Sequence, residues 1–250
     1  GPSSIAVVGK KAAFLTAFCS ELESLKEQTG KIQRKMDRSR RAMNLANYNP
    51  DRTPKKGIKL KWQYSNRYRH LQSKLQDYNR VMAATRRRCH GELSNQILRM
   101  GNCIKTEKLS YRSFQKNYGR SVSFRAPGML IEMLRRKAAN AGGELIEFST
   151  RKTKLSQVCH GCQKAEKKPL SQRWHSCDCG IGPVQRDLYS SFLAVHVKED
   201  RLDISQAQKA WPGAEPLLWR AMSSLEETAK GKSRLSSFGF KNWRQSGLYR

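Results

Sequence analysis

Acidic residues are scarce in this sequence of 250 residues. It contains 20 Asp and Glu against 49 Lys and Arg, which gives a formal net charge of +29 at pH 7. Such an excess of positive charge is larger than solubility requires. It indicates a polyanionic partner, of which nucleic acid is the commonest.

Long apolar runs are also missing. The sequence contains no stretch of 18 apolar residues that would predict a transmembrane helix. No secretory signal is recognisable, and the basic residues are spread over several segments rather than gathered in one amphipathic helix. We therefore expect no membrane partner.

The sequence lacks the even set of cysteines that is typical of disulfide-rich secreted proteins. Its seven cysteines are odd in number, and four are clustered as Cys159-x-x-Cys162 and Cys177-x-Cys179. This clustering favours a reducing compartment and one tetrahedral, structural zinc ion held by four thiolates. Zinc ribbons usually repeat the C-x-x-C spacing, so His175 is an alternative ligand if one thiolate of the C-x-C pair cannot reach the metal.

Apolar periodicities predict strands alternating with helices, as in an α/β domain with a mixed sheet. The predicted strands are residues 4–9, 12–18, 102–109 and 144–148. The predicted helices are residues 21–43, 67–97 and 126–143, and a helix that begins at Asp187. Residues 46–61 are predicted to form a loop, and "WPGAEPLLWRAM" predicts a turn and an amphipathic helix before a mobile tail.

Two of the few acidic residues lie beside apolar elements. Glu107 ends the strand "CIKTEKL", and Asp187 opens the helix "DLYSSFLAV". Carboxylates from distant parts of a sequence can hold a pair of Mg²⁺ ions about 3.5–4 Å apart for phosphodiester cleavage. From position alone, Asp187 could equally be a helix N-cap, and Glu107 an exposed charge at a strand end.

Basic residues are densest in the first two predicted helices. We predict that these helices contact nucleic acid through Arg34, Lys35, Arg38, Arg41, Arg86, Arg87 and Arg88.

Several motifs resemble, in order, those of the transposon-encoded TnpB (OrfB-type) family, which is related to type V CRISPR effectors. They are "MLRRKAANAGG", "SQVCHGC", "CDCG" and "RDLYSSFLA", preceded by the basic "KIQRKMDRSRR" and by "IKTEKLS". The resemblance runs from Gly1 to about Val197. It implies a RuvC nuclease on an RNase H-like fold, with Glu107 and Asp187 as catalytic, Mg²⁺-binding acids. It also implies guide RNA and target DNA as partners, in the cytoplasm of a prokaryote and near its nucleoid.

The resemblance also divides the chain. It implies a RuvC core with inserted basic helices over 1–150 and a zinc-ribbon insertion over 151–182 that binds target nucleic acid. The last RuvC motif then occupies 183–200, and a C-terminal helix with a flexible tail follows over 201–250.

The family's first aspartate is expected upstream of Gly1, so the first strand of the sheet is expected to be missing from this chain. The N-terminal half of the same protein, or a second polypeptide, would then supply that strand, and residues 1–250 alone would be inactive. Two functions therefore stay open, an RNA-guided DNA endonuclease and a nuclease-dead RNA-guided protein that represses or recruits. A zinc-ribbon adaptor is a weaker third interpretation, because it leaves Glu107 and the apolar strands unexplained.

Overall fold

The computed structural model describes residues 3–169, 171–228 and 235–240. The chain forms two compact units, each described here by itself. The core unit comprises Gly1–Phe18 and His90–Arg250, and the hairpin unit comprises Cys19–Cys89. None of the described helices has an apolar stretch long enough to cross a membrane.

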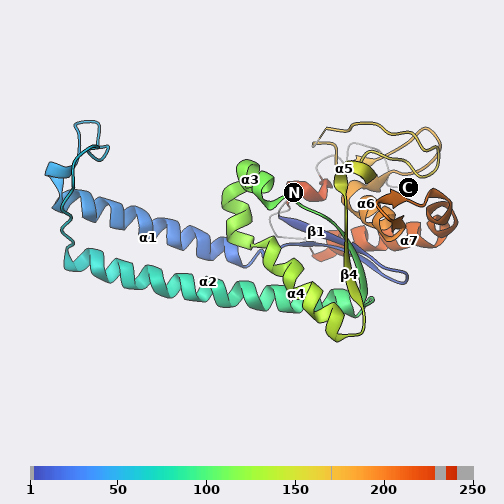
Figure 1. Cartoon of the computed structure of the whole chain (residues 1–250), viewed down its shortest axis with the longest axis horizontal. Helices are drawn as coiled ribbons and strands as arrows, with labels where there is room; N and C mark the ends of the chain where they lie inside the picture. The colour runs from blue at the N-terminus through green and yellow to red at the C-terminus, as the bar shows by residue number, and fades with distance from the viewer. Residues whose placement is uncertain (1–2, 170, 229–234, 241–250) are drawn as a thin grey trace. The chain divides into compact units, whose positions relative to one another are not determined.

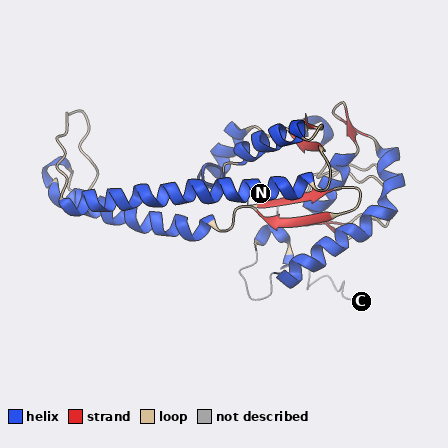
Figure 2. Cartoon of the chain, turned by 90° about the horizontal axis from the view of Figure 1, so that it is seen from below, coloured by secondary structure: helices blue, strands red, loops and turns tan. Residues whose placement is uncertain are grey.

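The hairpin unit is built from two long helices that run side by side (Figures 1 and 2). They are α1 (Leu22–Met43) and the first part of α2 (Asn66–Leu98), with the short helix η1 (Leu45–Asn47) after α1. Both long helices agree with the prediction. Few side chains of this unit are buried, so most of its residues form surface.

The core unit contains two separate pairs of longer strands. β1 (Ser4–Val8) and β2 (Ala13–Ala17) form the predicted antiparallel hairpin. β3 (Cys103–Glu107) pairs in parallel with β4 (Glu144–Phe148), which places Glu107 opposite Phe148. No ladder among the described residues joins the hairpin to the parallel pair, so the strands of the predicted mixed sheet form two separate pieces.

Helix α6 (Arg186–Val195) is the centre of the core unit. It packs against β1, where the Ser191 hydroxyl donates a hydrogen bond of 3.1 Å to the carbonyl of Ala6. On another side it packs against α7 (Ile204–Thr228), which also covers β2. The most deeply buried apolar side chains of α6 are Leu188, Tyr189, Phe192 and Leu193. A buried helix of this kind provides a rigid base for the acid at its start.

The remaining elements are short or were not predicted. Helix α3 (Tyr111–Arg125) was missed; the Ser110 hydroxyl caps it by accepting a bond from the Ser113 N–H. Ala126, in the left-handed conformation with φ 49°, separates α3 from the predicted helix α4 (Pro127–Asn140). The short elements are α5 (Thr150–Thr153), β5 (Trp174–His175), β6 (Val184–Gln185), β7 (Val197–Lys198), β8 (Arg201–Leu202) and η2 (Ser236–Phe238).

Helix α7 differs from the prediction because it continues through Pro212 and Pro216, where we expected a turn. Proline lacks the N–H that a helix interior uses and normally interrupts the helix. Here the buried side chains of Trp211, Ala214 and Leu218 hold the helix against the core. Tertiary burial therefore outweighs the local preference.

Part of the tail that we predicted to be mobile is packed against the core unit. Phe238 and Phe240 are buried, and the Trp174 indole N–H donates a bond of 3.0 Å to the carbonyl of Gly239. The other residues of the predicted mobile stretch, 229–234 and 241–250, lie outside the described residues.

Candidate metal centres

Four cysteines from two chain turns meet at one point. Their Sγ atoms all lie within 4.8 Å of one another, with 3.6 Å between Cys159 and Cys179 and 3.4 Å between Cys162 and Cys177. Four thiolates at about 2.3 Å from a zinc ion would be about 3.8 Å apart. The arrangement therefore fits a tetrahedral zinc ion.

The backbone around these sulfurs suits thiolates. A side chain at Gly161 would crowd the Cys179 sulfur, 3.0 Å from the Cβ position, and Gly180 has a φ of +91°, which favours glycine. The N–H of Cys179 faces the sulfur of Cys177 and lowers the pKa of that thiol to about 7. Burial raises the pKa of Cys159 to about 12, so this sulfur depends on a cation to become a thiolate.

The histidines beside the cysteines bind other groups. His175, the alternative zinc ligand, does not belong to the group of four cysteines. Its Nδ1 lies 2.7 Å from the Lys168 ammonium, and its ring stacks on the Tyr189 ring with centroids 4.1 Å apart. The backbone N–H of His160 donates to the Tyr189 hydroxyl at 3.0 Å, and its Nδ1 lies 2.7 Å from the same oxygen. Tyr189 thus connects both cysteine pairs to helix α6.

Asp187 lies in the first turn of α6 but does not cap it. The Gln185 side chain takes the N-cap position, because its oxygen accepts a bond of 2.8 Å from the Leu188 N–H. The Asp187 side chain is 28% exposed and lies 3.8 Å from the guanidinium of Arg186. The plain N-cap interpretation of Asp187 is therefore wrong, and its carboxylate is available to another partner.

Glu107 ends β3 with a half-buried side chain, so it is not simply an exposed charge. Burial raises its pKa, and the negative charge of Asp187 raises it further. The two acids are far apart in the sequence, yet their charges act on one another. Carboxyl groups with perturbed pKa values are typical of functional sites, and a bound cation relieves the repulsion between them.

Lys105 was not predicted to matter, but it fixes β3 to α6. Its ammonium donates bonds of 2.9 Å to the Val195 carbonyl and 2.6 Å to the Val197 carbonyl, at the C-terminal end of α6. Positive charge is favourable at this end of a helix. Lys105 and Glu107 are on the same face of β3, because side chains alternate along a strand. The strand that carries Glu107 is thus tied to the helix that carries Asp187.

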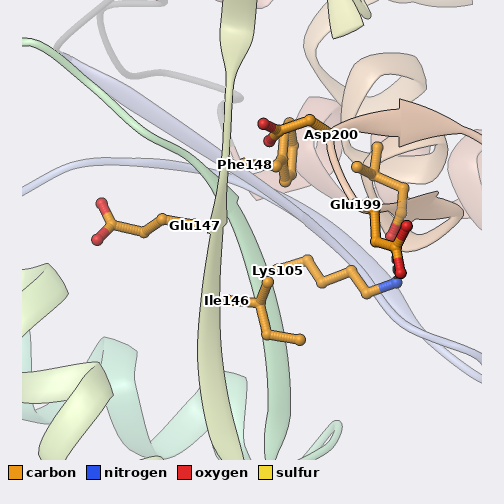
Figure 3. A pocket seen from close by; sticks show the side chains of 7 residues that line it. Lys105, Ile146, Glu147, Phe148, Glu199 and Asp200 are labelled. Atoms are coloured by element: carbon orange, nitrogen blue, oxygen red, sulfur yellow. Dashed lines mark hydrogen bonds between the residues drawn. The ribbon is translucent and has the colours of Figure 1, made fainter. Parts of the chain in front are cut away.

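A pocket of about 390 Å³ lies beside Lys105, lined also by Phe148, Glu199 and Asp200 (Figure 3). Asp200 accepts a bond of 2.7 Å from the Ser149 N–H, so it holds the β7–β8 turn against the end of β4. Figure 3 shows Glu147 pointing away from the other labelled side chains. We interpret this pocket as part of the scaffold.

Among the described residues, the four cysteines are the only group of three or more His, Cys, Asp or Glu side chains placed to hold one ion. Glu107 and Asp187 belong to no such group in the part of the chain that the structure describes. Hard carboxylate oxygens are the ligands that Mg²⁺ prefers, usually a few of them together with water and phosphate oxygens. The pair therefore fits part of a magnesium site.

The basic residues predicted to contact nucleic acid fall into two groups. Those with exposed side chains are Arg34, Lys35, Arg38, Arg87 and Arg88, of which Arg88 already pairs with Glu21. The other two are less accessible: Arg41 is half-buried and pairs with Asp37 at 2.7 Å, and Arg86 is half-buried. The exposed face of α1 is therefore the better candidate surface.

The raised pKa of Glu107 predicts a pH-dependent effect of Glu107→Gln. Without divalent ions, the charged form of the buried Glu107 side chain destabilises the fold. This effect begins as pH rises above about 4.3, the ordinary pKa of a glutamate, and is complete once pH exceeds the raised pKa of Glu107. Glu107→Gln removes this charge. We expect the variant to match the wild type near pH 4 and to be more stable than it near pH 8 in urea unfolding.

Glu144→Gln is the matched control, because Glu144 is an exposed glutamate at the start of the neighbouring strand. Its stability difference from the wild type should not grow with pH. A Glu107→Gln difference that is also independent of pH would mean that burial and the charge of Asp187 do not raise the pKa of Glu107 in solution.

One known family matches the chain over the segment that carries these features. Residues 128–192 match the family model described as Cas12f1-like, TNB domain. The matched segment includes β4, all four clustered cysteines and Asp187. No curated protein matches the chain. The match supports the resemblance found in the sequence, and the cysteine cluster suits a domain of the zinc-ribbon family. Over residues 128–192, this chain is therefore similar to TnpB/Cas12f-like effectors.

Proposed function

We propose that this chain is the RuvC and zinc-ribbon part of an RNA-guided DNA endonuclease that hydrolyses phosphodiester bonds of target DNA with Mg²⁺. The observation that carries the proposal is the raised pKa of Glu107, which is caused by burial and by the negative charge of Asp187. The TNB-domain match suggests a component of an RNA-guided nuclease more generally.

In this proposal Glu107 and Asp187 hold the metal ions at the scissile phosphate. Bound Mg²⁺ would activate the attacking water and stabilise the leaving oxygen. Lys105 and Gln185 hold the two ends of α6, so the carboxylates need little rearrangement when DNA arrives. The four cysteines would form a closed structural zinc site, which keeps the cysteine turns attached to α6 through Tyr189.

A further carboxylate from outside residues 1–250 completes the site in this proposal. It would come from the N-terminal half of the same protein or from a second polypeptide. We propose that it lies on a strand that pairs with the edges of β1 and β3 that no described strand covers, since a protein normally covers such edges.

A nuclease-dead, RNA-guided DNA-binding protein is the second candidate. It is favoured by one observation, that no group of three or more acids is brought together among the described residues. A plasmid-cleavage assay with the complete protein, guide RNA and Mg²⁺, beside a binding assay on the same samples, separates the two. Binding without any cleavage by the wild type would support the second candidate.

We predict that exposed basic residues of α1 bind nucleic acid phosphates. Each neutralised phosphate contributes roughly 0.7 to 0.9 to the slope of log affinity against log salt. Replacing Arg34, Lys35 and Arg38 together with glutamine should therefore reduce the magnitude of this slope by about two. Affinity for RNA and for DNA, measured over a series of salt concentrations, tests the prediction.

Gln33→Ala, an uncharged change on the same helix, should leave the slope as it is. Arg41→Gln should have a smaller effect than Arg38→Gln, because Asp37 already pairs with Arg41. An unaltered slope in the triple variant would mean that these side chains form only a solvent-exposed face of the helix and contact no phosphates.

A further inference from the structure

The loop at the end of the two long helices is ordered, although it has almost no apolar core. We name residues 44–65 the tip loop; they connect α1 to α2 (Figure 1). The buried Asn44 side chain donates to the carbonyls of Arg40 (2.7 Å) and Gln63 (2.8 Å) and accepts from the Gln63 N–H (2.7 Å). The Asn47 amide donates a bond of 2.6 Å to the Lys61 carbonyl. Long ordered connections of this kind usually have a function.

Aromatic rings and guanidinium groups gather at the base of the tip loop. The rings of Tyr48 and Trp62 meet edge to face with centroids 5.8 Å apart. Arg41 lies over Tyr48 at 5.8 Å, and Arg40 lies over Trp62 at 5.3 Å. Asp37 on α1 pairs with both arginines, at 2.9 and 2.7 Å. These contacts hold both guanidinium groups in place before any partner binds.

Tyr64, two residues after Trp62, carries an exposed ring. Its ring packs on Tyr68 with centroids 4.5 Å apart, yet the residue is 42% exposed. Met43, Leu45 and Ile58 are exposed as well, so four of the seven exposed large apolar residues in the described chain lie between 43 and 64. Tyr48 and Trp62 are half-buried and serve as a small core for the loop. The exposed four are not explained in that way, and their side chains are open to a partner.

The tip loop is also strongly basic. Its exposed cations are Arg52, Lys55, Lys56, Lys59 and Lys61, against one acid, Asp51. Asp51 is occupied within the loop, because its carboxylate accepts bonds from the N–H and the hydroxyl of Thr53 at 2.9 and 2.6 Å. The partner should therefore be anionic.

An exposed ring in a loop rich in lysine matches single-stranded nucleic acid, whose phosphates are attracted by cations while its unpaired bases stack on aromatic side chains. A duplex hides the faces of its bases, so it could use only the lysines. An anionic membrane surface would use the lysines and Ile58 but would gain little from arginines held against rings.

We propose that the tip loop binds single-stranded nucleic acid, with a base stacked on Tyr64 and the neighbouring phosphates on the loop lysines. This site lies outside the proposed cleavage machinery. A failure of the tip loop to bind a single strand would leave the assignment of Glu107 and Asp187 unchanged, and the reverse also holds.

The test uses the full chain and fluorescence anisotropy. The labelled probes are oligouridine and oligothymidine of about 12 nucleotides, within the range of single-strand sites, and a blunt DNA duplex of the same length. We expect Tyr64→Ala to weaken binding of both single strands roughly tenfold and binding of the duplex very little. Tyr64→Phe keeps the ring and should bind like the wild type. Tyr118→Ala, at another exposed tyrosine, is the matched control.

Single-strand affinities that are equal in the wild type and Tyr64→Ala would overturn the proposal, as would an equal loss for single strands and duplex. If circular dichroism shows that Tyr64→Ala misfolds, a variant with Lys55, Lys56, Lys59 and Lys61 replaced by glutamine takes its place. Unchanged single-strand affinity in that variant is then the overturning result. If the variant binds nucleic acid like the wild type but no longer binds phosphatidylserine vesicles, the tip loop would be assigned to a membrane surface instead.

Discussion

Replacing Asp187 with alanine is expected to abolish cleavage by the complete, guide-loaded protein while leaving target binding nearly unchanged. The carboxylate would hold metal that stabilises the transition state by several kcal/mol, so we expect the cleavage rate to fall roughly a thousandfold. Binding should persist, because guide pairing and the basic surface carry affinity. The measurement is plasmid cleavage with Mg²⁺, beside a binding assay on the same samples.

Asp203→Ala is the matched control for this experiment. Asp203 also stands at the start of a helix, where its carboxylate accepts a bond of 3.0 Å from the Gln206 N–H. If Asp187 acted only through the helix, the two variants would behave alike. Near wild-type cleavage by Asp187→Ala would therefore refute the catalytic assignment.

We expect Glu107→Ala to affect cleavage in the same way as Asp187→Ala. It should reduce cleavage as strongly as Asp187→Ala, and the double variant should lose little more than either single variant. Members of one catalytic unit are not additive, because removing one already disables the site. Additive losses would indicate that the two acids act independently.

Loss of zinc is the second large effect that we expect. Among the described residues of the cysteine segment, regular structure around the sulfurs is limited to short pieces such as the two-residue strands β5 and β6, so we expect the metal to supply much of the stability. Structural zinc contributes roughly 10 kcal/mol or more of binding free energy to small modules. Cys162→Ser should therefore reduce the zinc content from about one per chain to near zero and lower the melting temperature strongly.

Metal analysis and thermal unfolding of the purified protein, with and without a chelator, provide the measurement. Cys103→Ser is the control, because Cys103 is exposed and outside the cluster. We expect the damage in Cys162→Ser to reach α6, since Tyr189 bonds to His160 between the first two cysteines. A wild-type protein without bound zinc would contradict the prediction.

The sequence alone was sufficient for features that depend on neighbouring residues. The β1–β2 hairpin, the helices α1, α2 and α4, and the strands β3 and β4 follow from local apolar periodicity and turn residues. The clustering of the four cysteines follows from their spacing, because two short turns bring each pair together. The predictions about Glu107 and Asp187 came from the resemblance, since nothing local distinguishes a metal-binding acid from a cap.

Tertiary structure decided the features that depend on residues far apart in the sequence. Only the packing of β3 against α6 shows that Asp187 acts on the pKa of Glu107, and that Lys105 joins their elements. Gln185 rather than Asp187 caps α6, and Pro212 stays within a helix, because burial outweighs local preference at both places. The separate sheets and the pairing of Arg41 with Asp37 likewise depend on contacts formed in the folded chain. Periodicity along the sequence does not predict such contacts.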